Sequence, residues 1–77
     1  MSQEEQKQII LKKLGENIRN LRIKKNLSQE ELAFKINSAR NFIGCIERAE
    51  KSPTIITLCR IAKALEVKVE NLIYGIA

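Results

Sequence analysis

Arg40 and Asn41 are neighbours whose side chains can each form two hydrogen bonds with one planar partner. Arginine fits the O6 and N7 atoms of guanine in this way, and asparagine fits the N6 and N7 atoms of adenine. The small residues Gly44 and Cys45 follow, and another arginine, Arg48, stands about one helical turn after Gly44. A helix that carried these residues on its outer face could enter a DNA groove and contact base edges.

The sequence offers little material for other kinds of site chemistry. It contains no histidine, and its two cysteines, Cys45 and Cys59, are too few for a disulfide scaffold and lack the spacing of a zinc site. We interpret both as buried or inert thiols. The chain has no paired acidic cluster beyond helix caps and no glycine-rich phosphate loop, and its length leaves no room for a substrate pocket. We therefore expect no enzymatic activity and no metal, cofactor or small-molecule ligand.

Length and charge narrow the class of protein further. A chain of 77 residues forms one small domain, which buries only about 60% of its unfolded surface. Lysine and arginine total 14 against 9 acidic residues, and the net charge of +5 fits a nucleic-acid binder or simply a basic soluble protein. No apolar run approaches the roughly 18 residues of a membrane span, and the acidic N-terminus argues against a signal peptide. We expect a cytoplasmic protein without a membrane partner.

The elements that must position these side chains are helices, because apolar residues recur at helical spacing and strand alternation is missing. The pattern predicts a first helix from Ser2 to about Lys24, which starts with a capping box of Ser2 and Glu5. Two later helices are expected over about residues 54–65 and 69–74, the second ending at a glycine. The first helix is expected to bury one stripe of apolar residues, Ile10, Leu14, Ile18 and Leu21.

Two short helices, at about residues 28–36 and 40–48, have the properties of a helix-turn-helix. A second Ser-x-x-Glu capping box starts the first of them. The motif needs a small residue where its helices meet, which Ala33 supplies, and a short turn, which the three residues between the helices supply. The second helix is expected to bury Ile43 and Ile46 and to leave its polar residues outside.

A set of residues keeps one family's spacing through most of the chain: Leu27-Ser28-Gln29-Glu30-Glu31-Leu32-Ala33, Ile43, Ile46-Glu47-Arg48, Pro53, Thr57-Leu58 and Ile61-Ala62-Lys63-Ala64-Leu65. With these residues, the segment 14–72 resembles the lambda-repressor-like helix-turn-helix family, to which phage repressors and Cro-type proteins belong. The resemblance implies a compact all-α domain of five helices over residues 1–77, with the motif at about residues 28–48 and an N-terminal helix extension at residues 2–13. It also implies sequence-specific binding of double-stranded DNA and regulation of transcription.

The resemblance assigns base contacts to the second helix of the motif. Arg40, Asn41 and Cys45 match the family's base-reading positions, and the first two have suitable hydrogen-bonding groups. Cys45 would make at most a van der Waals contact. Gly44 either permits close approach to the bases or is merely tolerated, since glycine costs a helix roughly 1 kcal/mol relative to alanine.

Other residues are expected to hold phosphates or to orient the recognition helix. Gln29 matches the family position that holds a phosphate beside the free amides of its helix. Arg22 and Glu47 match an ion pair between the first helix and the end of the recognition helix, so the expected role of the pair is orientation. Phe42 either packs on the sugar-phosphate backbone or covers the edge of the core. The remaining residues expected at phosphates are Ser38, Arg48, Lys51 and Ser52.

Several residues depart from the family pattern, among them Ser38, which stands where a hydrophobic turn residue is common, and Gly44 inside the recognition helix. Ala39 stands where a capping side chain is usual, so the recognition helix loses about 1 kcal/mol of capping unless Ser38 replaces it. Ala49 and Glu66 replace glycines that often end helices, which leaves those helix ends defined only to within a residue or two.

The run from Arg40 to Arg48 is similar to the controller proteins of bacterial restriction–modification systems, which are short dimeric regulators. A chain with so small a core is expected to form a homodimer and to read a pseudo-palindrome. The expected dimer interface consists of apolar residues near the C-terminus, Leu72, Ile73, Tyr74 and Ile76.

Other functions remain open at this point. A Cro-like phage repressor fits the short chain nearly as well, and an antitoxin or adaptor would use the same fold for protein–protein interaction. Activation of transcription would need a surface that touches RNA polymerase, for which Glu30, Glu31 and Glu50 are candidates.

Overall fold

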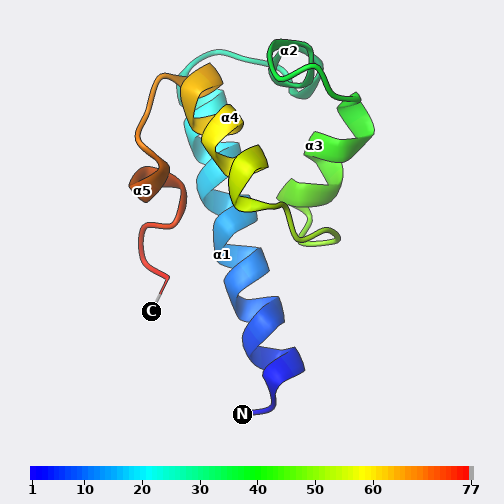
Figure 1. Ribbon diagram of the computed structural model, residues 1–77, viewed down its shortest axis with the longest axis vertical. Coiled ribbons are helices and arrows are strands. Elements are labelled where there is room, and N and C mark those ends of the chain that lie inside the picture. The colour runs from blue at the N-terminus through cyan, green and yellow to red at the C-terminus, as the bar shows by residue number, and fades with distance from the viewer. Residues whose placement is uncertain (77) are drawn as a thin grey trace.

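The computed structural model describes residues 1–76, which form five helices and no strand (Figure 1). The expected all-α class is therefore confirmed. No helix within this part of the chain is long and apolar enough to cross a lipid bilayer. The helices are α1 (Gln3–Lys24), α2 (Gln29–Lys35), α3 (Arg40–Glu47), α4 (Ile55–Leu65) and α5 (Val69–Leu72).

The helix starts follow from local side-chain chemistry. At α2, the hydroxyl of Ser28 accepts a hydrogen bond from the Glu31 amide, and the Glu31 carboxylate accepts one from the Ser28 amide, both at 2.9 Å. Ser2 and Glu5 form the same capping box at the start of α1. These hydrogen bonds to the charged form lower the pKa of both glutamates. The predicted capping boxes are thus confirmed.

Several helices end at residues with a left-handed backbone. Asn37, the predicted turn residue after α2, has φ of 56°. Ala49 and Glu66, which occupy positions where glycine is common, also adopt positive φ, at 62° and 58°. Side chains other than glycine and asparagine are disfavoured in this conformation because Cβ crowds the following carbonyl. The chain therefore keeps the family's turns at these two positions although it lacks their glycines.

The buried face of α1 is not quite the predicted one. Leu14 and Ile18 are buried as expected, but Ile10 and Leu21 are only partly buried. The fully packed line also includes Leu11, Gly15 and Arg22. The reason is the approach of α3, whose end comes so close that a Cβ on Gly15 would lie 2.6 Å from the carbonyl oxygen of Ile46. Because of this contact, the face of α1 that packs against the core is rotated from the predicted face.

One core joins all five helices. Ile18, Ile61 and Leu72 are fully buried in it, and Leu58 and Leu65 of the predicted α4 stripe are buried as well. Each large aliphatic side chain buried in this way contributes about 1.5–3 kcal/mol. The expected place of Leu72 in the dimer interface is therefore wrong, because its side chain is already buried within the protomer.

The C-terminal segment is tied to α1 by polar contacts. The amide of Asn17 donates to the carbonyl oxygens of Leu72 at 2.9 Å and of Tyr74 at 2.8 Å. Helix α5 ends at Leu72, two residues before the predicted end at Tyr74. Gly75 follows with φ of 79°. The carbonyl oxygen of Leu72, which a longer helix would bond to a later backbone amide, bonds to a side chain of α1 instead.

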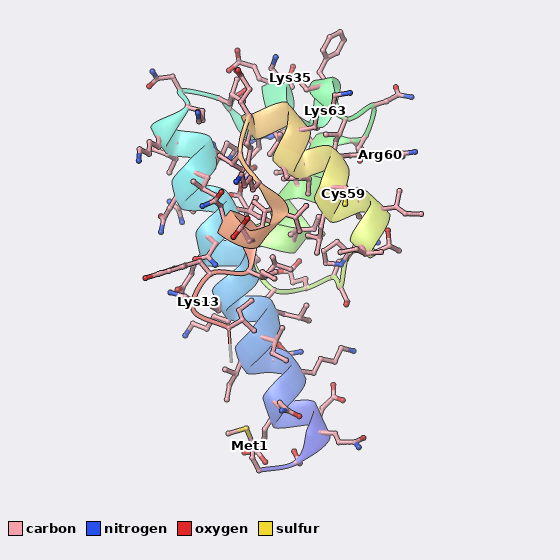
Figure 2. The ribbon with its side chains drawn as sticks, turned by 60° about the vertical axis from the view of Figure 1, so that its left-hand side comes forward. Met1, Lys13, Lys35, Cys59, Arg60 and Lys63 are labelled. Atoms are coloured by element: carbon pink, nitrogen blue, oxygen red, sulfur yellow. The ribbon has the colours of Figure 1, made fainter. Side chains whose placement is uncertain are left out.

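The N-terminal half of α1 projects beyond the other helices (Figure 1), with Met1 at its tip (Figure 2). This projecting half contains residues 2–13, the expected extension of the family fold. Its apolar Ile10 lies near Ile76 beside a shallow hollow. At the opposite end of α1, helices α2 and α3 pack against each other, and α4 lies against α2 and α5 (Figure 1).

Candidate nucleic-acid interface

Helices α2 and α3 form the helix-turn-helix. Ala33 on α2 is almost fully buried, as a close helix contact requires, and Ile43 and Ile46 of α3 are buried against it. The backbone amide of Ser38 donates to the carbonyl oxygen of Ala33 at 2.8 Å, which closes the turn that Asn37 begins. Core packing on one side of α3 therefore determines which side of that helix faces outward.

The start of α3 carries no side-chain cap. Ala39 has an extended backbone with φ of −85° and ψ of 149°, the usual conformation of a capping residue, but its side chain cannot accept a hydrogen bond. Ser38 does not replace it, and the first turn of α3 holds no acidic residue. This end of α3 therefore presents backbone amides and Arg40 without a carboxylate in its own first turn, which favours an anionic partner.

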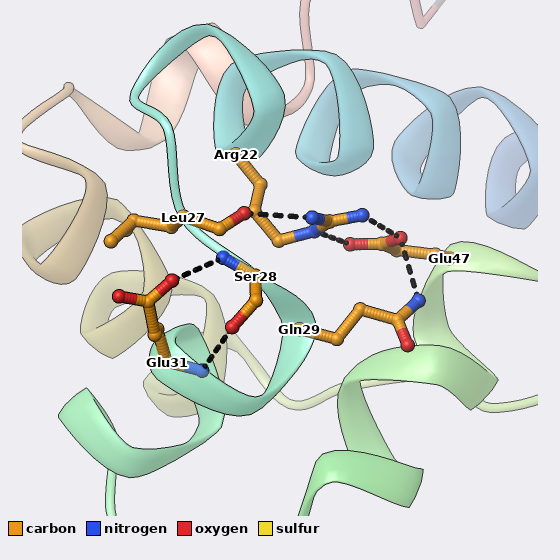
Figure 3. Close-up of polar contacts among 6 residues, drawn as sticks. All are labelled: Arg22, Leu27, Ser28, Gln29, Glu31 and Glu47. Atoms are coloured by element: carbon orange, nitrogen blue, oxygen red, sulfur yellow. Dashed lines mark hydrogen bonds and ion pairs between the residues drawn. The ribbon is translucent and has the colours of Figure 1, made fainter.

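A buried ion pair holds the other end of α3 (Figure 3). Arg22 Nε lies 2.7 Å from Glu47 Oε2, and Arg22 Nη2 donates to Glu47 Oε1 at 3.0 Å. The Glu47 side chain is only 3% exposed and that of Arg22 only 11%. Arg22 Nη1 also donates to the carbonyl oxygen of Leu27 at 2.8 Å. One guanidinium thus joins α1, the loop before α2 and the last residue of α3.

Gln29 belongs to the same network. Its amide nitrogen donates to Glu47 Oε1 at 3.1 Å (Figure 3), and its side chain is half-buried. Because an amide group carries two N–H donors, one hydrogen remains for a phosphate. Gln29 therefore links the predicted phosphate position directly to the carboxylate that orients α3.

The base-reading residues expected on α3 occupy three different environments. Arg40 and Asn41 are exposed at its N-terminal end, and Cys45 is half-buried on the following turn. Gly44 is buried, because the guanidinium of Arg48 lies across it: a Cβ on Gly44 would come within 2.9 Å of Arg48 Nη1. A neighbouring side chain thus covers Gly44 in this arrangement, and its approach to DNA bases stays a prediction.

The remaining expected phosphate contacts lie at the two ends of α3. Ser38 and Phe42 are half-buried, and the Phe42 ring packs against the core. Lys51 and Ser52 are exposed in the loop after α3. Arg48 is exposed and forms an ion pair with Glu50 at 2.9 Å. These residues lie around α3, and their contacts with DNA stay predictions.

Three residues have clear structural roles that the sequence did not predict. Gly15 allows the end of α3 to touch α1, and a glycine inside a strong helical pattern is a recognisable signal for close packing. Asn17 holds the C-terminal segment, and Glu50 binds Arg48. No local sequence pattern indicates these two contacts. The contact of Asn17 joins distant segments of the chain, and the contact of Glu50 with Arg48 depends on the backbone turn after α3.

Of the expected dimer residues, Ile73 and Tyr74 are exposed, at 45% and 75%, and Ile76 is partly buried. Of these, Ile76 borders the hollow near the C-terminus, together with Gly75 and the projecting half of α1. Their role in a dimer stays a prediction.

Known proteins share this architecture. The helix-turn-helix family profile matches residues 18–72, which include α2, α3, α4 and α5. The control protein C.SmaI of Serratia marcescens is 45% identical over 60 residues, which cover 78% of this chain and 71% of that protein. The crystal structure of the restriction–modification controller protein C.AhdI of Aeromonas hydrophila matches with a TM-score of 0.79 and 35% identity, covering 80% of this chain and 94% of that one.

A second solved structure is that of the controller protein C.Esp1396I, crystallised as a tetramer with its natural operator of 35 base pairs. It is 41% identical to this chain, with a TM-score of 0.72, and covers 77% of this chain and 78% of that one. The matched residues include the entire two-helix motif with its buried contacts and its outer face. This chain therefore belongs to the helix-turn-helix family.

Proposed function

We propose that this protein regulates transcription by binding a specific double-stranded DNA operator as a homodimer. The observation that carries the proposal is the position of Arg40 and Asn41, exposed at the uncapped end of a helix whose other end is held by a buried ion pair. A recognition helix must be fixed to its domain before its side chains can distinguish bases. The similarity to controller proteins, one of which was crystallised on its operator, supports the same conclusion.

In this account α3 enters the major groove, where Arg40 bonds to the O6 and N7 atoms of a guanine and Asn41 to an adenine. Each such pair discriminates against a wrong base by about 1–3 kcal/mol. The free N–H of Gln29 binds a phosphate beside the start of α2, and Lys51 and Ser52 bind phosphates beyond the end of α3. These contacts position the protein on the duplex without reading sequence.

Dimerisation gives the operator its symmetry. Two copies related by a twofold axis would place their α3 helices in half-sites about 34–36 Å apart, one turn of the double helix. Ile73 and Tyr74 are the exposed apolar side chains that we assign to this interface, with Ile76 beside them. The protein acts through binding rather than catalysis, in the cytoplasm on nucleoid DNA.

The similarity to controllers points to a particular genetic role. We assign the protein to a restriction–modification system, in which it would control the genes of a methyltransferase and an endonuclease. Its own gene should then lie beside these two genes. Neighbouring phage genes would instead favour a phage repressor and would contradict the controller assignment.

The experiment is a gel-shift titration with a duplex selected by the protein from a random-sequence library. The apparent affinity should fall steeply with salt concentration, by about 0.9 logarithmic units for each phosphate contact per tenfold change in salt. The control variant is Arg60→Ala, which removes an equal charge from a side chain that points outward from α4 (Figure 2). Arg60→Ala should lower the affinity for the selected duplex much less than Lys51→Ala does.

Two outcomes decide between this function and an adaptor. Selection of a symmetric sequence, bound by two protomers, supports the regulator. Absence of binding to any duplex at low salt overturns it and favours an antitoxin or adaptor that uses the fold to bind protein.

A further inference from the structure

Arg48 and Glu50 form an exposed ion pair just beyond the C-terminal end of α3. Arg48 Nε donates to Glu50 Oε2 at 2.9 Å and Arg48 Nη2 to Glu50 Oε1 at 3.2 Å, so the carboxylate binds one edge of the guanidinium through two hydrogen bonds. The same Nη2 lies 3.8 Å from Cys45 Sγ. Nη1 lies 2.9 Å from the position that a Cβ on Gly44 would occupy. The guanidinium therefore covers the middle of the expected base-reading face.

The backbone places Glu50 where it can make this contact. Ala49 adopts a left-handed conformation with φ of 62°, which turns the chain back at the end of α3. The Glu50 amide then donates to the carbonyl oxygen of Cys45 at 2.8 Å. This turn brings a carboxylate beside the last exposed turn of the recognition helix, where DNA phosphates would otherwise be attracted by Arg48.

A free arginine at this position would strengthen binding to every duplex. Cations near the groove attract phosphates of any sequence, and this attraction supplies essentially all non-specific affinity. A carboxylate that neutralises the cation removes that gain, and it also repels phosphates directly. Hydrogen bonds from Arg48 lower the pKa of Glu50, so the carboxylate stays charged near neutral pH.

We propose that Glu50 is a specificity-determining residue, which holds Arg48 over Gly44 and Cys45 and thereby weakens binding to DNA of arbitrary sequence. The inference rests on the proposed function, because it concerns the same interface. Arg48 contributes to binding in two cases only. In the first, contacts with the duplex compensate for breaking the ion pair with Glu50. In the second, the duplex offers a hydrogen-bond acceptor to the guanidinium while the ion pair stays formed. Glu50 acts through Arg48 and is a positioning residue.

Breaking the pair of Arg48 and Glu50 should leave the protein folded. Both side chains of the pair are more than half exposed, at 58% and 53%, and exposed ion pairs add little to stability. Glu50→Gln keeps the shape of the side chain and removes its charge. Glu70→Gln makes the same change in net charge on α5, away from the motif, and is the matched control.

The measurement is the affinity of each variant for a random-sequence duplex and for a duplex selected by the wild-type protein, over a range of salt concentrations. Glu50→Gln should bind the random duplex several-fold more tightly than Glu70→Gln does. Its salt dependence should steepen by about one phosphate contact per protomer. Affinity for the selected duplex should rise less, so the ratio of specific to non-specific affinity falls.

A third variant shows whether the effect passes through Arg48. In an Arg48→Ala background, Glu50→Gln should change the slope of the salt dependence much less, because only the direct repulsion of phosphates remains. A slope that changes equally in both backgrounds would overturn the positioning role, because Glu50 would then act only by direct repulsion. Equal behaviour of Glu50→Gln and Glu70→Gln would overturn the inference but leave the proposed function standing. If the wild-type protein binds no duplex, both fall.

Discussion

Arg22 of α1 and Glu47, the last residue of α3, bind each other inside the protein, with Arg22 Nε 2.7 Å from Glu47 Oε2. The carboxylate also accepts from Gln29, so all of its contacts come from outside its own helix. Among the described residues, no buried side-chain polar atom is left without a hydrogen-bond partner. A paired charge inside a small core is weak evidence for net stability, and its value here is a defined orientation of α3.

Glu47→Ala should lower the free energy of unfolding by about 3–5 kcal/mol, because it leaves the Arg22 guanidinium buried without its partner. Chemical denaturation followed by circular dichroism measures this loss. The matched control is Glu50→Ala, which breaks an exposed pair and should change stability by less than about 1 kcal/mol. Equal effects of the two substitutions would contradict a buried, orienting pair.

Gly15→Ala should destabilise the protein by about 1–3 kcal/mol, as overpacking usually does. The new Cβ would lie 2.6 Å from one backbone carbonyl oxygen and 2.7 Å from the next, and the backbone of α3 cannot shift without moving the motif. Gly44→Ala is the comparison, because its Cβ meets only the movable end of Arg48. That variant should be as stable as wild type or up to about 1 kcal/mol more stable.

Thermal unfolding of both glycine variants gives the comparison directly. If Gly15→Ala unfolded at the same temperature as Gly44→Ala, the close approach of α1 and α3 would be wrong.

Glu66→Gly should stabilise the protein by about 1 kcal/mol. Glu66 ends α4 with φ of 58° and ψ of 44°, a conformation in which its Cβ is strained and a glycine is not. The same substitution at Glu70, inside α5, should destabilise because glycine is a poor helix former. A Glu66→Gly protein with a lower melting temperature than wild type would contradict this reading of the turn.

Acid should weaken the helix starts at Ser2 and Ser28. The pKa of Glu5 and that of Glu31 are lowered from the ordinary value of 4.5 by hydrogen bonds from the capping serines. A carboxyl whose pKa is lower in the folded state stabilises the fold above its unfolded pKa. That stabilisation is lost as pH falls through the lower, folded value.

Helical content and melting temperature should therefore decline below a pH of about 4.5. Glu31→Gln can still accept the hydrogen bond from the Ser28 amide but cannot titrate, so its stability should depend less on pH over this range. An unchanged pH profile in that variant would show that the capping box at Ser28 does not contribute.

Features set by neighbouring residues could be predicted from the sequence. Both Ser-x-x-Glu capping boxes, the turn at Asn37 and the buried stripe of α4 are observed, because each depends on contacts within about one helical turn. The ion pair between Arg22 and Glu47, which the resemblance to the family implied, is also observed.

Features set by the approach of distant segments could not be predicted. The buried face of α1 passes through Leu11 rather than Ile10 because α3 touches Gly15. Helix α5 stops at Leu72, where the Asn17 side chain binds the carbonyl oxygen of Leu72 and, beyond the helix, that of Tyr74. Leu72 was placed in a dimer interface by its apolar character alone, which cannot distinguish a core from a contact between copies.

The most direct test of the central claim is the effect of Arg40→Ala on binding to a selected duplex and to a scrambled duplex of the same length, at one salt concentration. The account predicts a loss of about 1–3 kcal/mol on the selected duplex, relaxed preference at one base pair, and a much smaller loss on the scrambled duplex. Equal losses on the two duplexes would contradict it, because Arg40 would then be a phosphate contact and α3 would not read sequence through it.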